Sequence, residues 1–339
     1  GWSDFFDSTN KDISRVSRIT AIHRSHLVAS NGIENFNLYL QGNSPLDVAV
    51  GDWVLMSPDF VDEQNEKAAI ITDVLPRKTK LSRAGTKDES VIAANIDNVF
   101  IVTSANQDLN LKRLHRYLVL VNEGKAKPTI LLSKVDLLDE YQKLVSSLTN
   151  DLGVKVLACS MMKHLGIEEL LELMPPGSSS VFIGSSGVGK STITNRLLKR
   201  EIQKTNEIRD DDGKGKHTTR ARQMFSIPGH GLIIDTPGIR EVQVFGSEES
   251  LNDTFPQIES FINKCRFNNC QHKDEPGCAI LEALEKGNLP EEEWQSYQKL
   301  QREMAHTNRK MDKAAMANTK KRWKVISKAI RSKRKIEER

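Results

Sequence analysis

The sequence predicts a multidomain protein with three parts: an N-terminal β-barrel, an α/β domain built on a parallel sheet, and a C-terminal α-helical domain that holds a metal ion. Short strand-like runs between turn residues fill the first part. Alternating strands and helices around a glycine-rich loop fill the second, and three of the four cysteines lie together in the third. The 339 residues allow several domains with separate cores. We place them at 1–90, 91–250 and 251–300, followed by a basic tail at 301–339.

The composition excludes a membrane protein. No apolar stretch approaches the roughly 20 residues of a membrane helix, and the N-terminus lacks the layout of a signal peptide. We therefore expect a cytoplasmic monomer that contacts no membrane. The net charge of +4 is unevenly placed, because residues 301–339 carry 14 Lys and Arg against 4 Asp and Glu. This tail predicts contacts with RNA phosphates, and a solvated helix or disordered tail is the alternative.

Five runs of alternating or β-branched residues indicate the strands of a closed barrel, for which the OB-fold is the leading candidate. They span 18–23, 25–29, 36–40, 52–56 and 68–74. Such barrels often bind nucleic acid, although many only pack against neighbouring domains. Basic residues from Pro76 to Arg83 either contact phosphates or form a solvated linker, and the sequence leaves both open.

Strands and helices alternate in the second part. Strands are expected at 99–103, 129–132 and 155–158, and helices at 109–121, 141–152 and 167–173. This alternation predicts a parallel sheet with right-handed crossovers, whose ligands bind at the carboxyl ends of the strands.

A phosphate loop follows the next strand, at 181–183. Gly184-x4-Gly189-Lys190-Ser191 is the pattern of P-loop NTPases, in which backbone N–H groups hold the α and β phosphates. Lys190 would stabilise charge on the β and γ oxygens, and Ser191 would ligate Mg²⁺. The alternative is an ordinary glycine- and serine-rich turn before a helix. It would require that Lys190 and Ser191 stand at the start of the helix by chance. The expected contacts are Gly184, Ser185, Ser186, Gly187, Val188, Gly189, Lys190, Ser191 and Thr192.

A second phosphate-side motif ends the strand at 232–235. Asp235 would hold the Mg²⁺ hydration shell, and the N–H of Gly238 would reach the γ-phosphate.

Ser133-Lys134-Val135-Asp136 resembles the guanine-reading Asn-Lys-x-Asp of GTPases. The Asp136 carboxylate would accept two hydrogen bonds from guanine, which disfavours an ATPase because adenine lacks both donors. The Lys134 stem would lie along the base. Ser133 replaces an Asn whose amide could brace the phosphate loop, so nucleotide affinity is expected to be lower. Cys159-Ser160 occupies the place of Ser-Ala, whose backbone N–H meets guanine O6.

The order of these motifs predicts a circularly permuted GTPase. A standard GTPase begins with the phosphate loop, whereas this chain begins with the base-reading motifs and ends with Asp-x-x-Gly. Permutation preserves such a site because its loops lie at one edge of the sheet whatever the chain order.

The GTP-hydrolysing machinery lacks one familiar group. Ile239 stands where many GTPases have a glutamine that positions the attacking water. His217 is the candidate to orient that water, and an exposed loop histidine is the alternative.

Cys265, Cys270, His272 and Cys278 provide three thiolates and one imidazole within fourteen residues. This is the ligand set of a closed, structural Zn²⁺ site, and a cluster of reduced surface cysteines is the alternative.

Together, the barrel, the permuted motif order, Gly215-Lys-His-Thr-Thr219, Asp235-Thr-Pro-Gly-Ile-Arg-Glu241 and the cysteine cluster resemble the RsgA family of GTPases that depend on the small ribosomal subunit. The resemblance runs from about residue 20 to 300. It implies a late assembly factor that binds the small subunit and its rRNA, hydrolyses GTP when that particle stimulates it, and then leaves. It also favours Thr219 as the second Mg²⁺ ligand. A GTP-gated RNA-binding module with incidental hydrolysis is the alternative function.

Overall fold

The computed structural model describes residues 15–23, 26–40, 47–85, 89–106, 109–198, 222–236 and 244–313. The chain divides into two compact units. One comprises residues 1–81 and 91–241, and the other comprises 82–90 and 242–339. Among the described residues, no helix is both long and apolar enough to span a bilayer.

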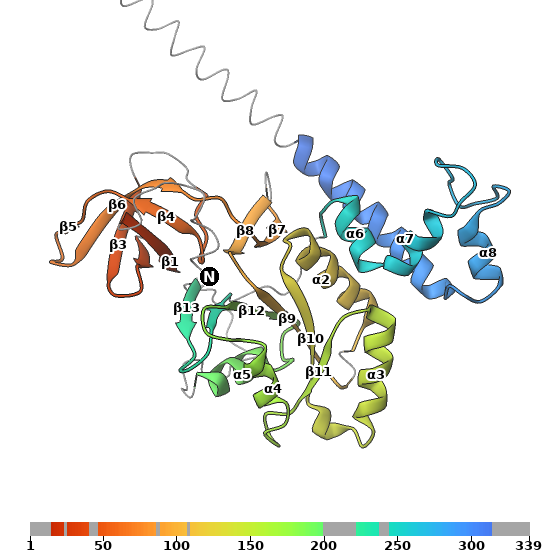
Figure 1. The fold of residues 1–339 in the computed structure, drawn as a ribbon, viewed down its shortest axis with the longest axis horizontal. Helices are drawn as coiled ribbons and strands as arrows, with labels where there is room; N and C mark the ends of the chain where they lie inside the picture. Colours follow the sequence, from red (N-terminus) through yellow and green to blue (C-terminus); the bar gives the residue numbers. More distant parts are fainter. Residues whose placement is uncertain are drawn as a thin grey trace, which may run out of the picture. The chain divides into compact units, whose positions relative to one another are not determined.

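The N-terminal strands form a closed barrel (Figure 1). Its strands are β1 (Val16–Ile22), β2 (Leu27–Ser30), β3 (Asn35–Leu40), β4 (Trp53–Met56) and β6 (Lys67–Val74), with the short β5 (Phe60–Val61) paired to β6. The pairing runs β1-β2-β3-β6-β4 and returns to β1, which closes the sheet. Alternate residues such as Ile19, Leu38 and Ile71 fill the interior and are at most 1% exposed. The predicted barrel is therefore confirmed.

A predominantly parallel sheet forms the α/β domain. Its strand order is β11-β10-β9-β12-β14-β13, and only β13 runs antiparallel to its neighbour. The strands are β9 (Asn98–Ser104), β10 (Lys127–Ser133), β11 (Val156–Cys159), β12 (Ser179–Gly184), β13 (Arg222–Ser226) and β14 (Leu232–Asp235). Central strands are buried on both faces, which explains their continuous apolar runs.

Helices cover both faces of this sheet (Figure 1). They are α2 (Leu111–Glu123), α3 (Tyr141–Leu152), α4 (Ile167–Glu172) and α5 (Lys190–Leu197), with the short 3-10 turn η2 (Val135–Leu137) after β10. The side chain of Asn110 caps α2 by accepting the N–H of Arg113. The α/β prediction is confirmed, including the buried parallel strands.

The barrel and the α/β domain share one continuous sheet. Strand β1 pairs antiparallel with β13 through Ala21 opposite Gln223 and Ile22 opposite Arg222. A separate two-stranded sheet joins β7 (Lys80–Ala84) to β8 (Glu89–Ala94).

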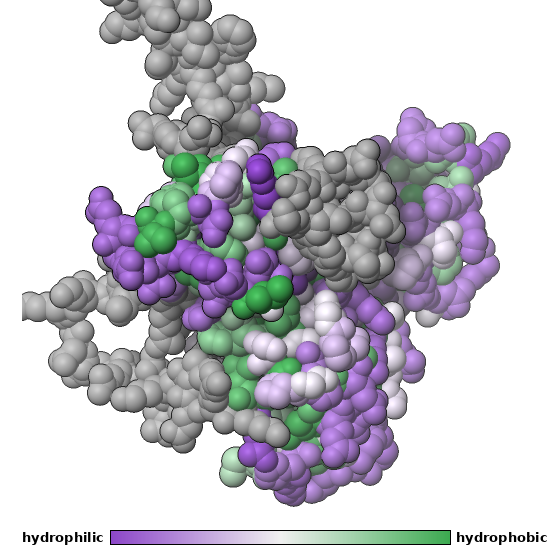
Figure 2. Space-filling view, turned by 60° about the vertical axis from the view of Figure 1, so that its left-hand side comes forward, coloured by the Kyte–Doolittle hydropathy of each residue, from purple (hydrophilic) through white to green (hydrophobic). Residues whose placement is uncertain are grey.

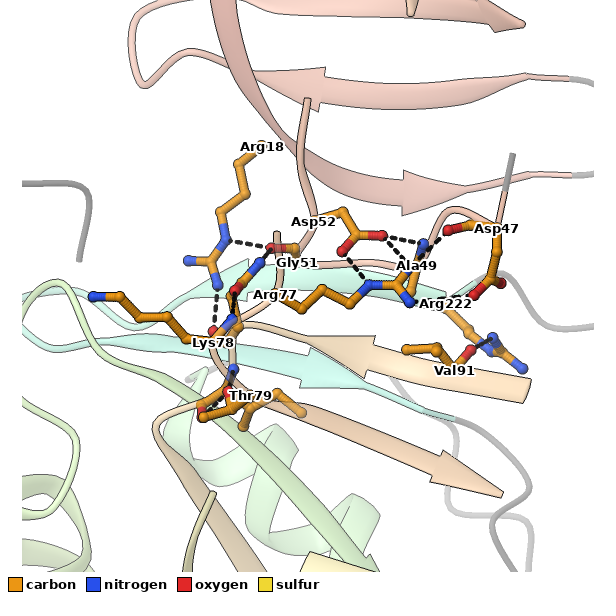
Figure 3. A network of polar contacts seen from close by, with 12 residues as sticks. Arg18, Asp47, Ala49, Gly51, Asp52, Arg77, Lys78, Thr79, Val91 and Arg222 are labelled. Atoms are coloured by element: carbon orange, nitrogen blue, oxygen red, sulfur yellow. Dashed lines mark hydrogen bonds and ion pairs between the residues drawn. The ribbon is translucent and has the colours of Figure 1, made fainter. Parts of the chain in front are cut away.

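Polar contacts reinforce the junction between these two domains (Figure 3). Arg77 makes a two-pronged ion pair with the fully buried Asp52, through Nε to Oδ1 at 2.7 Å and Nη2 to Oδ2 at 2.7 Å. The Arg77 side chain is thus held by an internal ion pair, so the solvated-linker alternative does not describe it, and contact of this segment with phosphates remains a prediction. Arg18 donates to the carbonyl oxygen of Gly51 at 3.2 Å and to that of Asn95 at 2.8 Å.

The second unit contains α6 (Glu248–Thr254), α7 (Pro256–Ile262), α8 (Ala279–Glu285) and a helix from 291 that is described to residue 313. Ser247 caps α6, and Pro256 occupies the first turn of α7, where a missing N–H costs nothing. Aromatic rings form the centre of this unit: Phe255 meets Tyr297 edge-on, and Trp294 stacks on Tyr297.

The face drawn in Figure 2 carries hydrophilic residues over most of its described surface, with hydrophobic residues gathered in smaller patches. Exposed large apolar residues of the barrel include Ile33, Phe60 and Val61.

Candidate functional site

The phosphate loop lies where a buried strand gives way to a helix. Gly184 ends β12 with a φ of 140°, and a Cβ there would lie 2.2 Å from the carbonyl oxygen of Val102. Gly187 and Gly189 also adopt positive φ angles, of 79° and 101°. These glycines let the backbone turn directly into α5, so that N–H groups gather at the helix start.

Lys190 lies across this loop. Its ammonium group donates to the carbonyl oxygen of Gly184 at 2.7 Å and to that of Ser185. The side chain is therefore held over the place where phosphate oxygens would bind, and a nucleotide would exchange these carbonyl contacts for charge-assisted ones. Ser191 is half-buried and Thr192 is exposed in the first turn of α5.

Ser133 supports the loop from the neighbouring strand. Its buried hydroxyl lies 2.7 Å from the carbonyl oxygen of Val188 and 3.1 Å from that of Thr103. The expectation that replacing Asn by Ser removes the brace of the loop is corrected: the hydroxyl reaches the loop backbone directly, because β10 and β12 both flank β9.

Lys134 makes a second link between the base-reading segment and the phosphate loop. The residue adopts a left-handed backbone with φ of 58°, and its ammonium group donates to the carbonyl oxygen of Gly187 at 3.0 Å. The base-reading and phosphate-binding segments are thereby joined at the carboxyl edge of the sheet.

The Asp136 carboxylate is oriented by Ser160. The Ser160 hydroxyl donates to Oδ1 of Asp136 and accepts the backbone N–H of Lys163 at 3.2 Å. Parallel pairing of Ser133 with Cys159 brings the two loops together.

Cys159 does not face this site. Its side chain is fully buried in the hydrophobic core, where burial raises the pKa of the thiol to about 12. Ser160, the next residue, is the one whose hydroxyl meets Asp136, a side-chain contact that the sequence analysis did not predict.

Strand β14 brings Asp235 to the same edge. Its pairing with β12 sets Val181 opposite Ile234, so that Asp235 lies at the carboxyl end of the strand next to the phosphate-loop strand. Gly238, His217 and Thr219 lie outside the described residues.

The four metal-ligating candidates converge in the second unit. The donor atoms of Cys265, Cys270, His272 and Cys278 all lie within 4.8 Å of one another. His272 Nδ1 is 3.6 Å from the sulfur of Cys265 and 3.4 Å from that of Cys278. Zinc–sulfur and zinc–nitrogen bonds at tetrahedral angles place such atoms about 3.6 Å apart, so the cluster is compatible with a zinc ion.

Two residues that the sequence analysis did not single out support this cluster. Glu275 accepts the backbone N–H groups of Gln271 at 2.7 Å and Lys273 at 2.9 Å, which holds the ligand loop closed. The ring of Trp294 meets that of His272 edge-on at 5.6 Å. The position of Glu275 between two candidate metal ligands was the only sign of this role in the sequence. It was not specific, because acidic residues are common in loops.

The fold and this site define a GTPase with a circularly permuted nucleotide domain, because the base-reading strands β10 and β11 precede the phosphate-loop strand β12 in the chain. Residues 74–245 match the family model described as RsgA GTPase, and residues 179–316 match one described as 50S ribosome-binding GTPase.

Curated relatives match along nearly the whole chain. "Small ribosomal subunit biogenesis GTPase RsgA" of Methanosarcina acetivorans is 38% identical over 350 residues, covering 99% of this chain and 93% of the relative. "Small ribosomal subunit biogenesis GTPase RsgA 1" of Listeria innocua is 40% identical over 343 residues, covering 98% and 96%. The chain belongs to the RsgA GTPase family, as the motif resemblance predicted.

Two crystal structures share the fold. YjeQ from Thermotoga maritima has a TM-score of 0.62 at 26% identity, covering 84% of this chain and 96% of its own. YloQ, described as a circularly permuted GTPase, has a TM-score of 0.61 at 22% identity, covering 86% of this chain and 95% of its own.

Proposed function

We propose that this GTPase acts as an assembly factor of the small ribosomal subunit, binding the particle and its rRNA in the GTP state and leaving after hydrolysis. The observation that carries this proposal is the assembled guanine edge, in which Ser160 orients Asp136 and Ser133 supports the phosphate loop. The names of the relatives, which refer to biogenesis of the small ribosomal subunit, support the choice of this particle.

The nucleotide edge suits hydrolysis of GTP. In the GTP complex the Asp136 carboxylate would accept the guanine N1–H and amino group, while a backbone N–H of the Cys159-Ser160 segment would donate to O6. Lys190 and the loop N–H groups stabilise the charge that develops on the leaving phosphate. Ser191, Thr219 and Asp235 supply oxygen ligands for Mg²⁺ or its waters, and the ion would neutralise phosphate charge.

His217 orients the attacking water in this proposal, because Ile239 has no group that could do so. The resulting expectation is a site that works slowly alone and is completed when the particle positions the His217 segment.

The Cys265, Cys270, His272 and Cys278 cluster holds one structural Zn²⁺. Four protein ligands leave no open coordination position, and the ion would supply folding energy to a loop with little core of its own. Metal content of the purified chain tests this: Cys270→Ser should lose the zinc, whereas Cys159→Ala should keep it. Equal zinc in both variants would contradict the assignment.

The proposed function is tested by GTP turnover with and without purified small subunits, with large subunits as the control that the second matching family description calls for. We expect small subunits alone to raise the rate by about 10² or more, as an added general-base contribution would. His217→Ala should lose this stimulation while the control His230→Ala retains it. A rate unchanged by either particle would favour instead a GTP-gated binder of another RNA.

A further inference from the structure

A basic pocket lies at the edge of the sheet opposite the phosphate loop. Asn98, Lys127 and Ser179 are the first residues of β9, β10 and β12, and all three line it. The nucleotide contacts are at the other ends of these strands. Seven-residue strands at about 3.3 Å per residue separate the two edges by about 20 Å, so this pocket is distinct from the GTP site.

The pocket is a hollow of about 380 Å³ between the barrel and the α/β domain. That volume is within the usual range for small-ligand sites and can hold one nucleotide. Trp53 and Arg18 come from barrel strands, Lys127 begins β10, and Lys78 and Lys125 lie in segments that precede strands. The charged residues of the lining are Arg18, Lys78, Lys125, Lys127 and Asp97.

Its charge favours an anion. Four cationic side chains face one carboxylate in this lining, and Oδ2 of that carboxylate, Asp97, already accepts the backbone N–H of Ser179 at 2.7 Å. Lys125 and Lys127 are exposed at the rim, two residues apart. Rim cations of this kind attract a polyanion more strongly than a single small anion, because several phosphates can contact them together.

Two donors in the lining have no partner within the described part of the chain. Arg18 is only 8% exposed, and its Nε and Nη2 bond to backbone oxygens whereas Nη1 has no acceptor there. The buried hydroxyl of Ser179 likewise has none. The hydroxyl of Ser179 is one of several buried hydroxyls without a partner among the described residues, so the Nη1 group of Arg18 is the donor in this pocket that an anion could use.

Arg18 is held in position to donate a hydrogen bond to an anion in the pocket. Its guanidinium lies over the Trp53 ring at 5.2 Å. Its backbone contacts tie it to Asn95 and to Gly51, of which Gly51 is labelled in Figure 3. Burial lowers the pKa of Arg18 to about 10, so the group remains charged at neutral pH although it is poorly solvated.

We propose that this pocket binds a phosphate group of RNA, with Arg18 donating inside and Lys125 and Lys127 holding neighbouring phosphates at the rim. The proposal rests on the proposed function, because it names where the chain would grip the RNA of its particle. A free mononucleotide has the same phosphate chemistry and is separated from RNA by the test.

The test compares two double variants with the same charge change. Lys125→Glu/Lys127→Glu alters the pocket rim, and Lys112→Glu/Lys155→Glu alters two other exposed lysines of the α/β domain. Binding of each to purified small subunits is measured at several salt concentrations with a non-hydrolysable GTP analogue. GTP turnover without particles checks that both variants are folded and should be unchanged, because none of the four lysines belongs to the nucleotide site.

We expect the rim variant to bind at least 10-fold more weakly and the control variant less than 3-fold more weakly. The slope of log Kd against log salt should also fall by about one or two in the rim variant only, because each phosphate that the rim no longer neutralises lowers the slope by about one. Equal weakening in both variants, or unchanged binding by the rim variant, would overturn the proposal.

Two further experiments are needed. One separates RNA from a free mononucleotide as the ligand, and the other separates failure of the pocket proposal from failure of the proposed function. Uridine monophosphate should not compete below about 1 mM; competition below about 100 µM that the rim variant abolishes would make this a small-molecule site and overturn the RNA assignment. If the wild-type chain does not bind small subunits, the proposed function fails. The pocket proposal is then tested by measuring the binding of a fluorescent 12-nucleotide oligouridine. The rim variant must bind it more weakly than the wild type, and equal binding would overturn the pocket proposal.

Discussion

The hydroxyl of Ser133 lies 2.7 Å from the backbone carbonyl oxygen of Val188, which makes the base-reading strand a support for the phosphate loop. Ser133→Ala removes the donor and leaves a buried carbonyl without it, at a cost of about 1–2 kcal/mol. We expect GDP affinity to fall by about 5- to 30-fold, measured by titration with a fluorescent guanine nucleotide. Ser146→Ala, which removes an exposed helix hydroxyl, is the control. Equal affinities in both variants would show that the hydrogen bond does not support the loop.

Asp136 should decide which base is bound. Asp136→Asn replaces two acceptors by one acceptor and one donor, so the amide clashes with the guanine N–H edge and suits xanthine. We expect GTP affinity to fall by at least 10-fold, since unpaired buried groups cost about 1–3 kcal/mol each, and affinity for xanthosine triphosphate to rise. Competition titrations with both nucleotides measure this. The neighbouring exposed Asp139→Asn should retain the preference for GTP.

Arg77 should be a stability residue. Arg77→Ala leaves the fully buried Asp52 carboxylate without its ion-pair partner, and uncompensated buried charges cost about 3–5 kcal/mol. Urea unfolding should show a loss of about this size. Lys67→Ala, which breaks an ion pair whose side chains are 49% and 44% exposed, should change little. A small effect at Arg77 would mean that water or another cation compensates Asp52.

His115 should make stability depend on pH. Burial lowers the pKa of His115 to about 4 from 6.5, so the unfolded chain binds a proton in this range that the folded chain does not. Its contribution is therefore complete above pH 6.5 and is lost as the pH falls towards 4. The loss amounts to about 3 kcal/mol at most.

Urea unfolding at pH 7.0 and 5.0 measures that dependence. His115→Gln should flatten the difference between the two pH values, whereas His306→Gln, which alters an exposed histidine, should leave it as in the wild type. An unchanged difference in His115→Gln would assign it to other groups.

Local patterns predicted much of this protein. The phosphate loop occupies eight consecutive residues, and the barrel strands follow a two-residue alternation, so both were visible without tertiary information. The metal cluster was equally visible because its ligands span fourteen residues. His217, Thr219 and Gly238 remain predictions, since they lie outside the described residues.

Features that depend on distant residues could not be predicted. The brace from Ser133 to Val188 joins positions 55 residues apart, and an asparagine-based pattern gave no reason to expect a shorter side chain to reach. Arg77 belonged to a basic run that suggested RNA, but the tertiary fold gives it a buried carboxylate. The basic pocket assembles Arg18, Lys78 and Lys127 from three separate segments, and no spacing rule connects them.

Because the barrel and the nucleotide domain share one sheet, the two cannot be separated without breaking strand pairing. Because β1 covers one side of β13 through Ala21 and Ile22, removing the barrel would expose an unpaired strand edge on the nucleotide domain. Bare edges recruit strands from other molecules, so a nucleotide domain cut free of its barrel would tend to self-associate. We therefore expect the barrel also to keep the domain that turns over GTP from self-associating, by covering the edge of β13.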